Sequence, residues 1–99
     1  MPALAEFQTV LGSTFELSEV SGGDAAPVVV SLVEVAASEP PPGWETFSLL
    51  FAGAVAALPQ ATYDVDHPVL GSFPLFLVPV LVAGRSEPYL EAVFNQPSP

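Results

Sequence analysis

The sequence contains no cysteine and only one lysine or arginine, which is Arg85. The lack of cysteine excludes a disulfide framework and a thiolate metal site. The lack of basic residues leaves 11 acidic side chains nearly unopposed, with a formal net charge of −10 at pH 7. Nucleic acids and anionic membrane surfaces would repel such a chain, so we expect neither as a partner. Solubility is the simpler explanation of the charge, and attraction to a basic partner is the alternative.

The sequence also lacks the segments that mark export or membrane insertion. Its N-terminus has no basic region followed by an apolar one, so no signal peptide is expected. The longest apolar run, 73–83, has eleven residues, whereas a membrane-spanning helix needs ~20. We therefore expect a cytoplasmic protein, with assembly into an extracellular or virion-like particle left open.

Apolar and turn-forming residues are what the sequence has in quantity. Hydrophobic residues make up 51% of the 99 positions, which is enough for a packed core and unlike a disordered chain. Twelve prolines and seven glycines predict many turns and short strands. A chain of this length corresponds to one domain. We place this domain at residues 1–95, with a C-terminal tail at 96–99.

The apolar run Phe73–Ala83 organises the rest of the chain. It reads FPLFLVPVLVA and has no polar side chain. Pro74 and Pro79 argue against a helix interior, and the abundance of Val, Leu and Phe predicts a buried strand. In a strand, successive side chains point to opposite faces. One face would carry Phe73, Leu75, Leu77 and Leu81, and the other would carry Phe76, Val78, Val80 and Val82.

Both faces of this predicted strand are apolar and should be covered. Fully burying one large apolar side chain is worth roughly 1.5–3 kcal/mol, so leaving three in water would forgo about 5–9 kcal/mol. That is comparable to the whole stability of a typical domain, ~5–15 kcal/mol. Cover must therefore come from this chain or from another. Each proline also lacks a donor for the sheet, and we expect the two to bracket a short core strand at Leu75–Val78 rather than to flank a bulge.

The remaining segments predict one helix and several strands. Ala3–Leu11 has the apolar spacing of one helix face, with Gly12 as its stop. Alternation and β-branched content predict further strands at 13–20, 27–35, 46–51, 59–67 and 89–94. In the second of these, Val30 and Leu32 share one face, and Val35 lies on the other.

Turn-forming residues separate these strands. Gly22–Asp24 is expected to form a turn, and 36–45 and 52–58 are expected to be loops. The predicted fold class is mainly β: a small antiparallel barrel or sandwich of about six strands with one short N-terminal helix.

Candidate catalytic or metal-binding residues are few. Asp64 and Asp66 share one face of a predicted strand, whereas His67 points to the opposite face. A three-ligand metal site is therefore geometrically poor, and a solvated strand face is the simpler interpretation. No serine stands in a recognisable motif with His67 and an acid, and Gly22-Gly23 lacks the helix and lysine of a phosphate loop. We predict that the protein is not an enzyme and needs no cofactor.

Several segments carry a family resemblance. In order, they are FSLLF at 47–51, LPQATY at 58–63, HPVLG at 67–71, LFLVPV at 75–80 and YLEAVFN at 89–95. Together they resemble a family of small bacterial domains catalogued as a domain of unknown function. The family's usual glycine appears here as Ala61, which puts a positive φ at that position in doubt. The resemblance implies no catalytic residues, and it implies an association with tail-collar or fibre-like proteins.

We therefore expect a non-enzymatic structural or interaction domain that self-associates or docks on a protein partner through apolar strand surface. The predicted contact residues are Trp44, Phe73, Phe76, Val78 and Val80, although anchoring of its loop is the simpler role for Trp44. One alternative is a small barrel that holds an apolar ligand among Phe47, Phe51, Phe76 and Phe94. The other alternative, a metal-dependent enzyme using Asp64 and Asp66, is weaker.

Overall fold

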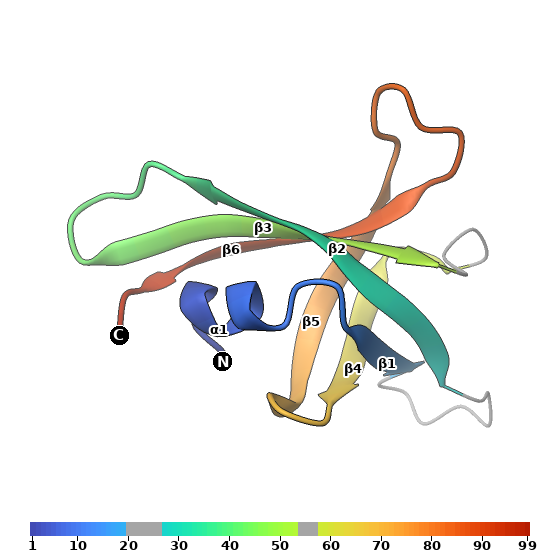
Figure 1. Ribbon diagram of the computed structural model, residues 1–99, viewed down its shortest axis with the longest axis horizontal. Helices are drawn as coiled ribbons and strands as arrows, with labels where there is room; N and C mark the ends of the chain where they lie inside the picture. Colours follow the sequence, from blue (N-terminus) through green and yellow to red (C-terminus); the bar gives the residue numbers. More distant parts are fainter. Residues whose placement is uncertain (20–26, 54–57) are drawn as a thin grey trace.

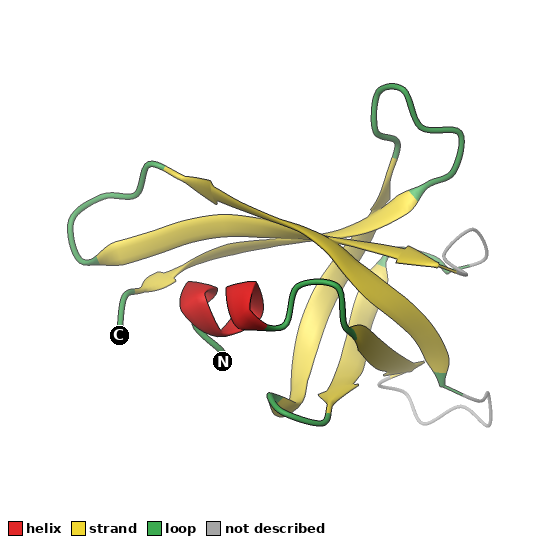
Figure 2. Cartoon of the chain, viewed as in Figure 1, coloured by secondary structure: helices red, strands yellow, loops and turns green. Residues whose placement is uncertain are grey.

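The computed structural model describes residues 1–19, 27–53 and 58–99 (Figures 1 and 2). The elements are α1 (Leu4–Thr9), β1 (Thr14–Glu19), β2 (Val28–Ser38), β3 (Trp44–Gly53), β4 (Ala61–His67), β5 (Gly71–Val80) and β6 (Tyr89–Pro97). All neighbouring strands pair antiparallel, and they close into a barrel in the order β1-β2-β3-β6-β5-β4. The predicted mainly β fold is confirmed, as a barrel rather than a sandwich.

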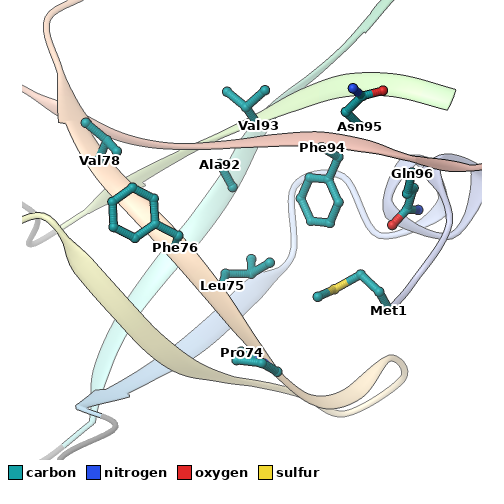
Figure 3. A pocket seen from close by; sticks show the side chains of 10 residues that line it. All are labelled: Met1, Pro74, Leu75, Phe76, Val78, Ala92, Val93, Phe94, Asn95 and Gln96. Atoms are coloured by element: carbon teal, nitrogen blue, oxygen red, sulfur yellow. The ribbon is translucent and has the colours of Figure 1, made fainter. Parts of the chain in front are cut away.

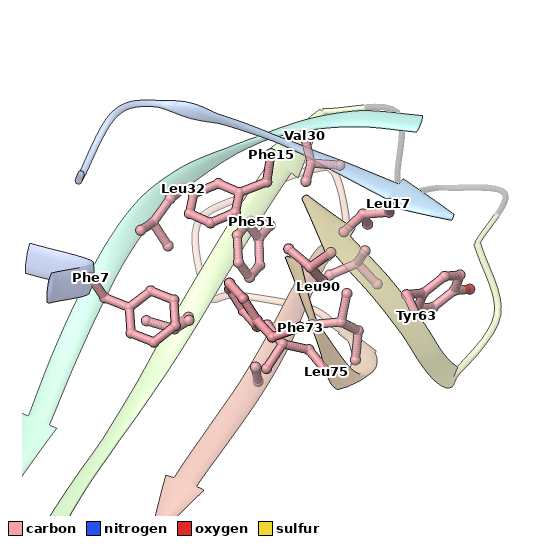
Figure 4. Packing of buried hydrophobic residues seen from close by; sticks show 14 of the residues in the cluster. Phe7, Phe15, Leu17, Val30, Leu32, Phe51, Tyr63, Phe73, Leu75 and Leu90 are labelled. Carbon is pink, nitrogen blue, oxygen red and sulfur yellow. The ribbon is translucent and has the colours of Figure 1, made fainter. Parts of the chain in front are cut away.

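The interior of the barrel is filled by the inward-facing side chains of the alternating strands (Figure 4). Along β3, Phe47, Leu49 and Phe51 are at most 1% exposed. Along β6, Leu90 and Phe94 are buried on the same side. These are the faces that the sequence alternation predicts.

Helix α1 is held against the barrel by Phe7, the one buried side chain of the helix. The Phe7 ring centroid lies 5.9 Å from that of Phe47, 5.9 Å from that of Phe73 and 5.3 Å from that of Phe94. A helix of six residues is marginal by itself, so this contact keeps it in place. No helix in the described ranges is long and apolar enough to cross a membrane.

An irregularity in β2 changes which of its residues face inward. The strand runs to Ser38, past the predicted end, and its pairing with β3 shifts between Leu32 and Glu34. A bulge of this kind adds one residue to one strand and alters the alternation beyond it. Val35, predicted on the face opposite Val30, consequently packs against the core.

Several predicted boundaries differ from the structure. β3 extends beyond 46–51 at both ends, into segments that were predicted to be loops. β6 runs to Pro97, so Gln96 and Pro97 belong to the sheet rather than to the tail. The predicted turn at Gly22–Asp24 lies outside the described residues. Ala61 begins β4 without a positive φ, because only glycines have one in the described chain.

The apolar run forms β5, a single strand that includes both prolines. The prediction that Pro74 and Pro79 bracket a shorter strand is therefore wrong. Residues 71–77 of β5 pair with β4, whereas 78–80 pair with β6. Each proline thus lies where β5 has a strand neighbour on one side only, which is the usual place for a proline within a sheet.

Only one face of β5 is covered within the described chain. Phe73, Leu75 and Leu77 face the core and are at most 8% exposed. Phe76, on the opposite face, is 54% exposed. The predicted extended conformation is confirmed up to Val80, and Leu81 lies beyond the strand. Among the described residues, this second face is therefore not covered at Phe76, whereas Val78 and Val80 are half-buried.

Candidate functional site

A groove opens in the barrel wall where β5 and β6 separate (Figure 3). The two strands pair only over 78–80 of β5 and 89–91 of β6, and beyond these residues they diverge. The hollow between them has a volume of about 510 Å³. Binding pockets typically measure ~300–1,000 Å³, so the groove is large enough to receive part of another molecule.

The rim of this groove is apolar. Phe76 and Val93 are 54% and 72% exposed, and Val78 is half-buried between them and the strand junction. Isolated apolar side chains are normal on a protein surface, whereas neighbours on adjoining strands form a patch. We call Phe76, Val78 and Val93 the rim patch.

One end of the groove is shaped by the N-terminal segment. The Gln96 side-chain amide donates to the Pro2 carbonyl at 3.1 Å and to the Glu45 carboxylate at 2.8 Å. The same Glu45 carboxylate accepts a bond from the Leu4 N–H at 3.0 Å. These bonds tie the start of the chain to β3 and β6, and Met1 consequently lines the groove.

The structure places the predicted contact residues unequally. Phe76 and Val78 lie at the groove, whereas half-buried Val80 lies at the end of β5, opposite Tyr89. Trp44 is 43% exposed at the start of β3, opposite Pro97 and away from the groove lining.

Two corrections concern this predicted surface. Phe73 is buried against Phe7, so its predicted place on an exposed contact surface is wrong. Val93 was missed, although the inward alternation of Ala92 and Phe94 implies that the residue between them points outward.

His67 and half-buried Ser13 form a pair that local sequence patterns do not predict, because 54 positions separate them. The His67 Nε2 lies 2.8 Å from the Ser13 Oγ. The other ring nitrogen, Nδ1, accepts bonds from the N–H groups of Val69 and Leu70 at 3.0 and 3.3 Å. Nδ1 therefore carries no proton, and Nε2 is the donor to Ser13.

The direction of these bonds argues against a nucleophilic serine. The Ser13 hydroxyl donates to the Val10 carbonyl at 2.5 Å, so its proton points away from His67. A catalytic base must accept the serine proton. Burial also lowers the pKa of His67, which favours the neutral ring that the two backbone donors require. The pair fixes the β4–β5 turn to the end of α1.

Asp64 and Asp66 lie on the exposed outer face of β4, and His67 faces the interior, as predicted. Asp66 accepts a bond from the Ser72 hydroxyl and lies opposite Glu16 of β1. Within residues 1–19, 27–53 and 58–99, acids and histidine form no group of three or more that would hold a metal ion. The arrangement is that of a solvated acidic strand face.

The four phenylalanines proposed to enclose an apolar ligand do not surround one space. Phe47 and Phe94 stack with centroids 4.6 Å apart, and Phe51 packs edge-on against Phe15 at 5.2 Å. Phe76 points outward from β5. Of the four, Phe76 and Phe94 line the groove between β5 and β6, whereas Phe47 and Phe51 are buried in the core.

The chain belongs to the family described as Domain of unknown function (DUF6916), whose sequence profile matches residues 2–94. This match covers the helix, β1 to β5 and β6 as far as Phe94, so it includes most of the groove lining. No match was found among curated proteins or among solved structures.

Proposed function

We propose that this chain is a non-enzymatic interaction domain that docks on a protein, either a different protein or a second copy, through the groove between β5 and β6. The observation that carries the proposal is the rim patch: Phe76 and Val93 are more than half exposed beside a neutral hollow. Burial of such a patch against a partner is favourable, because it removes apolar surface from water on an otherwise strongly acidic chain.

The remaining geometry supports a role without chemistry. The Ser13 hydroxyl donates to a backbone carbonyl and not to His67, so this pair has a structural role, and Asp64 and Asp66 are solvated. An accessory role in a phage-tail-like or fibre assembly is the finer form of this proposal, and it depends on the family resemblance.

A position-specific crosslink in living cells tests the docking surface. Phe76 is replaced by photoreactive benzoylphenylalanine, which keeps an aromatic side chain at that position. The matched control carries the same group at Val69, which is 75% exposed at the β4–β5 turn. We expect an adduct from position 76 and none from position 69, and the adduct mass separates a second copy from a different protein.

Light scattering on the purified protein completes the test. If position 76 gives no adduct beyond that of position 69, and the protein remains a monomer at high concentration, the proposed function is wrong. An adduct from both positions would indicate non-specific collision and would also count against the groove.

Binding of a small apolar ligand is the second candidate, and the volume of the groove favours it. The ligand would lie on the rim patch rather than in the barrel interior. Native mass spectrometry of the purified protein tests this function: a co-purified small molecule that is lost in Phe76→Ala supports it, and an unliganded mass contradicts it.

A further inference from the structure

The pairing of Pro79 fixes which backbone groups face the groove. Pro79 lies opposite Leu90, and it has no N–H to donate. In an antiparallel ladder, hydrogen-bonded pairs alternate with pairs that exchange no bonds. Pro79–Leu90 is therefore a non-bonded pair, and the bonds between these strands are made by Val78 with Glu91 and by Val80 with Tyr89.

The same alternation continues into the part of β6 that lines the groove. If Glu91 directs its N–H and C=O toward β5, then so do Val93 and Asn95, two and four positions further on. Ala92 and Phe94 direct theirs toward β3, where they lie opposite Leu49 and Phe47. The β3 side of β6 is thus satisfied, while the Val93 and Asn95 backbone groups face the groove, where β6 has no strand pairing in the described chain.

The β5 side of the groove is a poorer template for another strand. Pro74 is separated from Pro79 by an odd number of residues, so its nitrogen points to the opposite edge, toward the groove. A proline on an edge strand removes a donor and hinders further pairing. The free edge of β6 has no such block until Pro97. An incoming strand is therefore expected to pair with β6.

Charges around the groove define what the incoming strand should carry. The lining has no charged side chain, whereas Glu91 lies opposite Val78 at the closed end and Asp64 lies opposite Pro74 on the neighbouring strand. A second copy would bring the same acids and a further net charge of −10 to the interface. An apolar segment with lysine or arginine beside it would instead meet complementary charge.

We infer that the groove accepts an extended segment of another protein, apolar in its centre and flanked by Lys or Arg, which adds to the free edge of β6. This inference depends on the proposed function and narrows it from docking in general to strand addition by a basic partner. Main-chain bonds to Val93 and Asn95 would supply affinity, and contact with Phe76 would select apolar side chains.

The first experiment selects binders from a displayed library of random short peptides with the purified protein. We expect enriched peptides to have alternating apolar residues beside Lys or Arg, and Phe76→Ala to weaken their binding about tenfold or more. The matched control, Val69→Ala, removes an exposed apolar side chain away from the groove and should leave binding unchanged.

The second experiment reads the edge directly by amide hydrogen exchange with an enriched peptide. In the free protein, Val93 and Asn95 should exchange faster than Ala92 and Phe94, which pair with β3. Peptide binding should slow exchange at Val93 and Asn95 by about tenfold or more and leave the other two unchanged. N-methylation of alternate amides in the peptide should abolish this protection and binding together.

The outcomes separate the inference from the proposed function. Enriched peptides that lack basic residues, or binding without protection of Val93 and Asn95, would overturn strand addition by a basic partner while leaving docking intact. A dimer that Phe76→Ala converts to monomer, with no enriched peptide, would make a second copy the occupant. No enrichment, no dimer and no crosslink at position 76 would overturn both.

Discussion

Replacing Phe7 with alanine should destabilise the domain more than its position in a short helix suggests. Phe7 has no exposed surface, and its ring contacts Phe47, Phe73 and Phe94. Truncation of a buried phenylalanine costs ~3–5 kcal/mol. Of the other helix residues, Leu4 packs against the core but is only partly buried, so Phe7 supplies most of the contact.

The assay is thermal and urea unfolding followed by tryptophan fluorescence or circular dichroism. A loss of about 3 kcal/mol corresponds to a decrease in Tm of at least about 12 °C for a domain of this size. The matched control is Phe76→Ala, because Phe76 is 54% exposed and its removal should change stability by no more than about 0.5 kcal/mol. Equal effects of the two substitutions would refute the role of Phe7 as the anchor of α1.

Two further predictions concern the Ser13–His67 pair and Gly53. Burial lowers the pKa of His67 below its ordinary value of 6.5, so the unfolded chain takes up the proton first as the pH falls. The contribution of His67 to stability is therefore complete above pH 6.5 and is lost as the pH falls from there through the folded-state pKa; urea midpoints should show this decline, and His67→Phe should remove it. Gly53→Ala should cost about 1–3 kcal/mol, because Gly53 has φ +126° and a Cβ there would lie 3.3 Å from the Val29 carbonyl oxygen. Gly71→Ala, at φ +83° with nothing within 4 Å, measures the backbone part alone in the same thermal melts.

The strands could be predicted where apolar and polar residues alternate along the sequence. Phe47, Leu49 and Phe51 repeat at every second position within the predicted strand 46–51, and the strand they form buries them on one face. The face of Val35 was predicted wrongly, because the register shift between Leu32 and Glu34 depends on pairing with β3. A bulge has no periodic signal of its own in this sequence.

The candidate site was less predictable because it arises from tertiary arrangement. Phe76 could be assigned to the face opposite Leu75, but nothing local indicates that β5 and β6 separate after a short pairing. The contact between Ser13 and His67 joins distant segments and was equally hidden. The apolar character of both faces of the run predicted a need for cover, and only the register showed which face lacks it.

The prolines of β5 also matter before the chain folds. Short apolar β-forming segments free of charge can stack into fibrils when they are exposed, and 73–80 is the most apolar segment of this sequence. Because Pro74 and Pro79 lack donors on opposite edges, a stack of such segments would lose hydrogen bonds on both sides of every layer. Pro74 and Pro79 therefore protect the unfolded chain against aggregation through its most apolar segment.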